Sequence, residues 1–227
     1  MGKEYFESGP YGKQEYRIIE RNYQILFEYG RRIFPDIFRR KLKMLDFGCA
    51  FGVGTFWLSN KINGIVVGVD ISEYAIQKAK KFFLSNNIKF YCLDLSVIEN
   101  INFLIRMHGK FDVIFSRDVI EHIPKEKQKV IIKNFSTLLS DGGVVMIGTA
   151  NGLNPYSYIC DKTHIGLRTP WSYKRLFKEA GITIVKSFEK QWIPFLWRFR
   201  RDRSLMEIDL PLFGFMVYIF AKKVDAN

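Results

Sequence analysis

The chain has 227 residues, 48% of them hydrophobic and 16% aromatic, and a formal net charge of +12. The length suits one sizeable domain with additions, and the composition is that of a globular rather than a disordered protein. Three cysteines without a C-x-x-C pair predict neither a disulfide framework nor a zinc site, so a reducing cytoplasm is the expected location. Basic residues are mostly dispersed along predicted helices and concentrate only at 39–43 and 198–203.

The beginning of the chain predicts a helical leader. No signal-peptide core follows Met1, and the longest apolar run, residues 212–221, is too short to cross a bilayer. We therefore expect no transmembrane segment. Residues 14–33 carry apolar side chains at helical spacing, and Pro35 ends this pattern. Residues 1–40 are interpreted as an N-terminal leader ahead of the main domain at 41–227.

A glycine-rich turn follows the first predicted strand. Residues 43–47 form a short apolar run, glycines stand at positions 48, 52 and 54, and a helical pattern begins at Thr55. Glycines let a ligand approach bare backbone, and a helix N-terminus presents free N–H groups to it. The stretch therefore predicts a cofactor-binding loop.

The spacing of this loop restricts the cofactor. Gly48-x-x-x-Gly52-x-Gly54 is not the dinucleotide pattern G-x-G-x-x-G, and no Gly-Lys-Ser/Thr follows, as a Walker A loop would require. The next predicted strand, residues 64–70, ends in Asp70, about one βαβ step after Asp46. A carboxylate at that position can accept hydrogen bonds from both hydroxyls of a ribose.

The rest of the chain continues the alternation of strands and helices, which predicts a parallel sheet covered on both faces. After Asn151 the order changes, because an irregular loop replaces the next regular element. Further strands are predicted near 88–92, 111–116, 143–149, 182–188 and 213–221, with a loop at 151–170, a helix at 170–180 and an aromatic, basic insertion at 191–211.

Four motifs in this order resemble those of class I S-adenosylmethionine-dependent methyltransferases. The resemblance implies an α/β fold with a Rossmann-like, doubly wound, seven-stranded, mostly parallel sheet, an antiparallel last strand and the N-terminal helical leader. It covers roughly residues 43–185, and Ala50 departs from it where many relatives carry glycine. The motifs are Asp46-x-Gly48-x-x-x-Gly52-x-Gly54, Gly68-Val69-Asp70-Ile71-Ser72, Leu93-Asp94-Leu95 and Phe111-Asp112-Val113-Ile114.

Downstream motifs resemble one branch of these enzymes, which contains ubiquinone-pathway O-methyltransferases and many small-molecule and glycan methyltransferases. The segments that carry this resemblance are Val119–Ile123, Leu138–Gly143, Thr149–Asn151 and Thr163–Ile165 together with Lys178–Gly181. The implied reaction is O-methylation of a small molecule, a quinone-type lipid precursor or a sugar. The leader and the loops at 151–170 and 191–211 are expected on the substrate side of the pocket.

The resemblance also implies the cofactor and its contacts. S-adenosyl-L-methionine is the expected methyl donor, with S-adenosyl-L-homocysteine as product. Asp46 would orient the loop and the methionine ammonium, Asp70 would bind the ribose, and Asp94 with Leu95 would meet the adenine. The full predicted set is Asp46, Phe47, Gly48, Cys49, Gly52, Asp70, Ile71, Asp94, Leu95, Ser116 and Arg117.

Methyl transfer to a hydroxyl needs a positioned nucleophile and a base for its proton. The candidate catalytic residues are Asp118, His122 and His164. Asp118-x-x-Glu121-His122 also resembles the Glu-x-x-Glu-His that holds a divalent metal in some ubiquinone-pathway enzymes. A metal is the disfavoured alternative, because the first acid is one methylene shorter here and Glu-His is common in relatives without metal.

Two other functions remain open from the sequence. The insertion at 191–211 places Trp192, Phe195 and Trp197 beside Arg198, a mixture that suits RNA binding, a lid over the pocket or contact with an anionic membrane. An RNA methyltransferase is therefore one alternative, although no Asn/Asp-Pro-Pro-Tyr or Pro-Cys motif follows the fourth strand. A binding module that keeps the fold without catalysis is the other.

Overall fold

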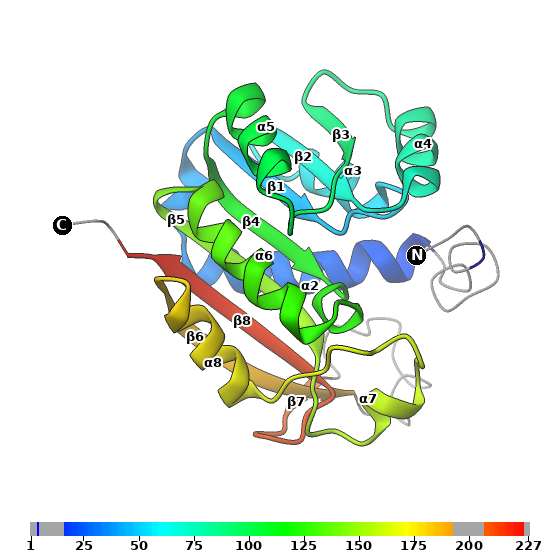
Figure 1. Ribbon diagram of the computed structural model, residues 1–227, viewed down its shortest axis with the longest axis vertical. Helices are drawn as coiled ribbons and strands as arrows, with labels where there is room; N and C mark the ends of the chain where they lie inside the picture. Colours follow the sequence, from blue (N-terminus) through cyan, green and yellow to red (C-terminus); the bar gives the residue numbers. More distant parts are fainter. Residues whose placement is uncertain (1–3, 5–15, 193–206, 225–227) are drawn as a thin grey trace.

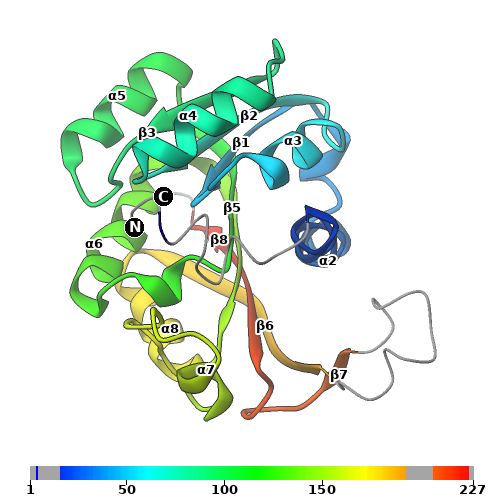
Figure 2. The same cartoon turned by 90° about the vertical axis from the view of Figure 1, so that its right-hand side faces the viewer.

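The computed structural model describes residue 4 and residues 16–192 and 207–224. These residues form an α/β fold in which one sheet lies between two layers of helices (Figures 1 and 2). The strands are β1 (Leu42–Phe47), β2 (Gly64–Asp70), β3 (Ile88–Cys92), β4 (Phe111–Arg117), β5 (Leu139–Ala150), β6 (Ile182–Trp192), β7 (Glu207–Asp209) and β8 (Met216–Lys223). The α-helices are α2 (Tyr16–Ile33), α3 (Val53–Ser59), α4 (Glu73–Phe82), α5 (Ile98–His108), α6 (Lys125–Leu138), α7 (Tyr156–Ile159) and α8 (Pro170–Glu179), with short 3-10 turns η1 (Ile37–Arg39) and η2 (Ile120–His122).

The sheet has the strand order β3-β2-β1-β4-β5-β8-β6-β7. Strands β1 to β5 are parallel, whereas β8 runs antiparallel to both β5 and β6. The predicted doubly wound, mostly parallel fold with an antiparallel last strand is therefore confirmed. An eighth short strand extends it: β6 continues beyond the predicted end at 188, and β7 from the predicted insertion pairs with that extension.

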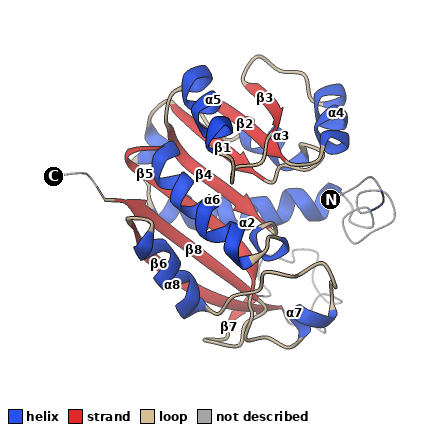
Figure 3. Cartoon of the chain, in the orientation of Figure 1, coloured by secondary structure: helices blue, strands red, loops and turns tan. Residues whose placement is uncertain are grey.

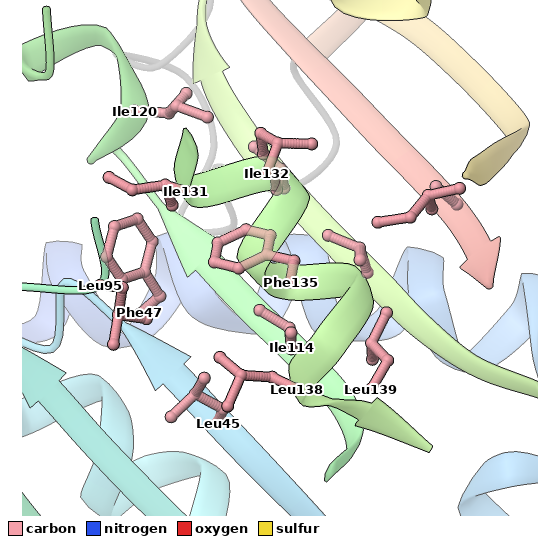
Figure 4. Packing of buried hydrophobic residues seen from close by; sticks show 14 of the residues in the cluster. Leu45, Phe47, Leu95, Ile114, Ile120, Ile131, Ile132, Phe135, Leu138 and Leu139 are labelled. Atoms are coloured by element: carbon pink, nitrogen blue, oxygen red, sulfur yellow. The ribbon is translucent and has the colours of Figure 1, made fainter. Parts of the chain in front are cut away.

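One face of the sheet packs against α5, α6 and α8, which lie in front of it in Figures 1 and 3. Figure 4 shows the centre of this core, where Phe135 of α6 lies over the sheet near Ile114 and beside Leu138. Phe135 also meets the ring of Phe47 edge-on, at 5.4 Å between centroids. Because α6 buries its apolar stripe here, the turn that precedes it is held over the carboxyl ends of β1 and β4.

The opposite face packs against α2, α3 and α4. The stripe of α2 predicted from helical spacing, including Ile19, Tyr23 and Leu26, is buried in this core. Gly30 permits the close approach, because a Cβ there would lie 1.9 Å from the Met146 methyl on β5. The leader helix is thus packed into the same core as the sheet. Over the described ranges, no helix is both long and apolar enough to cross a membrane.

The strand order reverses between β1 and β4, which are neighbours although β2 and β3 lie between them in the sequence. Ligands of open α/β sheets bind outside the carboxyl ends of the strands at such a switch. Strands β1 to β5 all end at this edge, so the topology brings together the beginnings of the segments that follow them, although these segments are distant in the sequence.

The packing of α6 predicts a contrast between two apolar residues of one helix. Phe135 is fully buried, whereas Val130 is 44% exposed. We expect Phe135→Ala to lower the free energy of unfolding by about 3–5 kcal/mol, since it leaves a cavity in the core. The control Val130→Ala should change it by no more than about 0.5 kcal/mol. Chemical denaturation measures both, and similar values for the two variants would contradict this packing.

Candidate active site

The loop after β1 adopts a backbone that few residues tolerate. Gly48, Ala50 and Gly52 have φ of 80°, 48° and 81°. Glycine is required at the first and third of these positions for space as well, because a Cβ on Gly48 would lie 2.2 Å from Val119 and one on Gly52 2.7 Å from Phe90. Ala50 occupies the left-handed region with its methyl group. At Gly48 and Gly52 the loop therefore presents backbone without a side chain.

Asp70 holds this loop from the neighbouring strand. Its Oδ2 accepts a hydrogen bond from the Ala50 N–H at 3.0 Å, and its Oδ1 accepts one from the Ser72 N–H at 2.9 Å. Burial raises the pKa of Asp70, and these backbone hydrogen bonds oppose that rise. The carboxylate lies at the end of β2 and lines the cavity described below. It can therefore accept hydrogen bonds from hydroxyl groups of a ligand in that cavity.

Asp46 lies beneath the loop and is fully buried. Its carboxylate accepts hydrogen bonds from Tyr23 Oη at 3.0 Å and from Thr55 Oγ1 at 2.6 Å. Burial raises the pKa of Asp46 to about 7, although both hydrogen bonds act in the opposite direction. Asp46 thus connects α2 and α3 by hydrogen bonds beneath the loop. Its predicted contact with a methionine ammonium stays a prediction.

Asp94 follows β3 and faces the same edge. Its Oδ1 accepts hydrogen bonds from the N–H and the hydroxyl of Ser96, and its Oδ2 pairs with Lys127 Nζ of α6 at 3.1 Å. Partial burial raises the pKa of Asp94, but the Ser96 hydrogen bonds and the Lys127 charge outweigh it and hold the pKa below the usual value. Leu95 is buried beside it and contributes an apolar wall.

The end of β4 supplies an ion pair. The Arg117 guanidinium pairs with the Asp118 carboxylate and lies 5.6 Å over the Tyr218 ring. Burial raises the pKa of Asp118, and the Arg117 charge opposes that rise. Asp118 has φ of 56°, which turns its side chain out of the strand direction. Ser116 has a different place, because its hydroxyl is buried and donates to the Phe47 carbonyl at 3.1 Å.

Two histidines, His122 and His164, meet in the cavity wall, with ring centroids 4.8 Å apart. His164 Nδ1 lies 2.6 Å from the Ser157 carbonyl, which only accepts, so Nδ1 carries the hydrogen. His122 Nδ1 lies 2.9 Å from Thr163 Oγ1, whose own hydrogen goes to Asp161 at 2.6 Å. In the neutral form, both rings therefore have their basic atom at Nε2.

Gln128 of α6 holds the two histidine-bearing segments together. Its buried Nε2 donates to the carbonyls of Ile120, Ile123 and Gly166, at 2.7–2.8 Å. The Gly166 N–H in turn donates to the Glu121 carbonyl at 2.8 Å. The turn that carries His122 and the loop that carries His164 are thus linked by one amide, although 42 positions separate the two histidines.

The predicted metal ligands are rearranged in the structure. Glu121 and His122 group with His164, with ligand atoms within 4.8 Å of one another, whereas Asp118 pairs with Arg117. Ligands of one ion at about 2.1 Å lie no more than about 4.2 Å apart. Both Glu121 oxygens already accept hydrogen bonds, from Thr149 Oγ1 and the Ala150 N–H. The spread of 4.8 Å exceeds this span, so an ion with ligands at about 2.1 Å would require these donors to move closer together.

These groups surround one cavity of about 980 Å³, the upper end of the usual size range for ligand pockets. Three predicted residues, Asp46, Gly52 and Ser116, lie behind its wall instead of lining it. The predicted residues that line it are Phe47, Gly48, Cys49, Asp70, Ile71, Asp94, Leu95, Arg117, Asp118, His122 and His164.

Sequence reasoning missed several lining residues. Ile18 and Asn22 of α2, Lys127 of α6, Tyr156 of α7 and Met216 of β8 all contribute to the cavity wall. The helical stripe indicated a leader helix, and the loop at 151–170 was expected on the substrate side, so those two regions carried a usable signal. For Met216 no sequence signal existed, because only the pairing of β8 with β5 brings it to this edge.

A glycine loop that opens on such a cavity, at the switch of a doubly wound sheet, is the architecture of S-adenosylmethionine-dependent methyltransferases. The chain has this fold, and two of the solved structures that share it hold S-adenosylmethionine or S-adenosylhomocysteine. A family model described as a methyltransferase domain matches residues 16–187, so the chain belongs to that family. The match begins at the leader helix α2 and ends within β6.

Known relatives methylate different atoms. The chain is 30% identical over 152 residues to phosphoethanolamine N-methyltransferase 1 of Arabidopsis thaliana, covering 63% of this chain and 29% of that protein. It is 32% identical over 117 residues to ubiquinone biosynthesis O-methyltransferase of Glaesserella parasuis serovar 5 (strain SH0165), covering 48% and 45%. The matches thus span less than half the length of these relatives.

Solved structures share the fold at low sequence identity. Magnesium protoporphyrin IX methyltransferase from Synechocystis PCC 6803, with bound SAH, superposes with a TM-score of 0.62 at 17% identity, covering 97% of each chain. A putative sarcosine dimethylglycine methyltransferase from Galdieria sulphuraria reaches a TM-score of 0.66 at 15% identity, covering 90% of this chain and 86% of that one. These likenesses concern the fold.

The place of Asp70 predicts its contribution to cofactor binding. Asp70→Ala removes the acceptor at the end of β2 and the hydrogen bond to the loop, so we expect S-adenosylhomocysteine to bind about 1–3 kcal/mol more weakly. Glu99→Ala, at an exposed acid on α5, is the matched control and should bind normally. Isothermal titration calorimetry measures both, and an unchanged dissociation constant for Asp70→Ala would contradict the assignment.

Proposed function

We propose that the chain transfers the methyl group of S-adenosylmethionine to a hydroxyl oxygen of a small, largely apolar acceptor, with His164 as the general base. The observation that carries this proposal is the His164 imidazole in the cavity wall, with its Nδ1–H held by the Ser157 carbonyl. Its Nε2 is then the atom that accepts a proton. O-methylation requires such a group, because the hydroxyl must lose its proton as the bond to carbon forms.

The charges of the cavity wall support a neutral acceptor. Of the described lining residues, the cationic ones besides histidine are Arg117 and Lys127, and they form ion pairs with Asp118 and Asp94. A phosphorylated acceptor would require one of these pairs to open. Apolar side chains from several elements make up much of the remaining wall, among them Ile18, Val119, Ile123, Ile131, Phe215 and Met216.

The cofactor takes the loop side of the cavity in this proposal. Asp70 accepts hydrogen bonds from the ribose hydroxyls, and Asp94 and Leu95 flank the adenine. Gly48, which has no side chain, leaves room for the methionine part. Two carboxylates near the loop, Asp46 and Asp70, favour a ligand that carries a sulfonium and an ammonium. The cavity volume of about 980 Å³ leaves room for an acceptor beside the cofactor.

The reaction is a displacement at the methyl carbon. The acceptor oxygen forms the new bond to carbon as the bond from carbon to sulfur breaks, which leaves neutral S-adenosylhomocysteine and the methyl ether. The hydroxyl proton passes to His164 Nε2. Asp118, which interacts electrostatically with His164, stabilises the resulting imidazolium, and His122 packs against the ring and keeps it in place. Catalysis then consists mainly of alignment and proton removal.

Other acceptors differ in the support that they have. A quinone-type lipid precursor or a sugar also carries hydroxyl groups, and the apolar wall favours the former. For RNA or an anionic membrane, the proposed contact was the insertion at 191–211, most of which, residues 193–206, lies outside the described residues. The other basic segment, at 39–43, is partly engaged, since Arg40 pairs with Asp112 and Lys43 binds the His108 carbonyl. A binding module without catalysis is disfavoured by the His164 arrangement.

Replacement of the base should separate chemistry from binding. We expect His164→Gln to lower kcat by about 10²–10⁴-fold for an acceptor found by screening phenols, lipids and sugars, because proton removal contributes that much. S-adenosylhomocysteine should bind His164→Gln with nearly normal affinity. Steady-state kinetics and calorimetry measure the two effects.

The third histidine provides the control. His108 contacts Tyr91 Oη at 3.0 Å, away from the cavity wall, so His108→Gln should keep normal turnover. Unimpaired turnover by His164→Gln would contradict its role as base. Loss of turnover in His108→Gln at unchanged fold would show that the effect is not specific to the cavity.

The arrangement of Glu121 predicts independence of metal. Because Asp118 is paired with Arg117 and the remaining donors spread more widely than ligands at about 2.1 Å, we expect turnover to persist after exhaustive treatment with a chelator. Turnover that is lost on chelation and restored by Mg²⁺, Mn²⁺ or Zn²⁺ would contradict this and assign the ion to Glu121, His122 and His164. Metal analysis of the purified protein provides a second measurement.

A further inference from the structure

One hydrogen-bonded group joins the leader helix to the base of the cofactor loop. Tyr23 of α2 and Thr55 of α3 each donate to a different oxygen of Asp46, at 3.0 Å and 2.6 Å. Asp46 is fully buried and Tyr23 is 5% exposed. The carboxylate is therefore oriented from two helices that lie on the same face of the sheet.

The Tyr23 ring packs closely against Phe115 and Gly54. It stacks on Phe115 of β4 with centroids 5.0 Å apart. Gly54 also lies against the ring, because a Cβ there would be 2.2 Å from it. The third glycine of the loop thus provides room for Tyr23. Tyr23 also lines the cavity, together with Ile19 and Asn22 of α2.

We propose that Tyr23 is a positioning residue for the cofactor, which orients the Asp46 carboxylate beneath the loop. Cofactor affinity would then depend on how α2 packs against the sheet. This inference rests on the cofactor site proposed above. Removal of the Tyr23 hydroxyl would leave one Asp46 oxygen buried without that donor, a change that disfavours the charged form of the carboxylate.

The surroundings of Asp46 make its charge sensitive to that hydroxyl. Burial raises the pKa to about 7, the hydrogen bonds from Thr55 and Tyr23 lower it, and the charge of Asp70 on β2 raises it. The thiol of Cys49 in the loop also faces this group, and burial raises its pKa well above the usual value, so it stays protonated. From α3, the neutral hydroxyl of Thr55 completes the set.

The sign of the pH dependence follows from linkage. A ligand with an ammonium group binds better when Asp46 is charged, so affinity is greatest above the pKa and falls as the pH drops through about 7. If the loss of the Tyr23 hydroxyl raises the midpoint by about one pH unit, affinity at pH 7 falls about fivefold, whereas affinity at pH 9 is nearly unchanged.

The experiment is a calorimetric titration with S-adenosylhomocysteine at several pH values between 6 and 9, on the wild-type chain, Tyr23→Phe and Tyr29→Phe. Tyr29 is the matched control, because it lies on the same helix but packs on Phe188 at 4.9 Å. We expect Tyr23→Phe to bind about fivefold more weakly at pH 7 and to recover at pH 9. Tyr29→Phe should follow the wild type throughout.

A second variant tests the same contact from the other side. Gly54→Ala keeps the hydroxyl but displaces the ring, so it should show the same loss at pH 7 and the same recovery at pH 9. Equal weakening at every pH would overturn the inference and leave Tyr23 a packing role alone, and unchanged affinity would overturn it as well. Failure of the wild type to bind at any pH would instead overturn the proposed function.

Discussion

The turn after β1 is the constraint on which the rest of the site depends. Its backbone enters the left-handed region at Gly48, Ala50 and Gly52, and it stays there because the N–H groups of Gly48 and Cys49 both donate to the Val69 carbonyl, at 2.8 and 3.0 Å. The loop is thus bent over the end of β2 by backbone hydrogen bonds. The Asp70 carboxylate adds a side-chain hydrogen bond to the Ala50 N–H of the same turn.

Buried polar groups then place the chemical groups. The Gln128 amide joins the segments of His122 and His164, and Asp46 joins α2 and α3 beneath the loop. Each of these groups is almost fully paired, which buried polar atoms require in a medium of low dielectric constant. The same burial shifts the pKa of Asp46 upward, so the groups that stabilise the site also make it sensitive to protonation.

Hydrophobic periodicity and glycine spacing were sufficient to predict the elements of the doubly wound sheet, because they are local consequences of strand and helix geometry. The sheet edge formed by β6 and β7 was predicted less well than the central strands. β6 extends to Trp192 and pairs with β7, since an open strand edge accepts any segment that reaches it, and no local pattern at 207–209 indicates that pairing.

From the sequence by itself, the spacing within single strand-to-helix connections predicted a ligand-binding loop and an acid at position 70. The resemblance of the ordered motifs to a known family implied the class of protein and the roles of the acids at positions 46 and 94. Only the tertiary structure decided which residues meet. It placed Asp46 behind the cavity wall under Tyr23, paired Asp118 with Arg117, and brought His164 against His122. Such contacts depend on how segments that are distant in the sequence pack together where the strand order reverses. The spacing of residues along the sequence does not specify that packing.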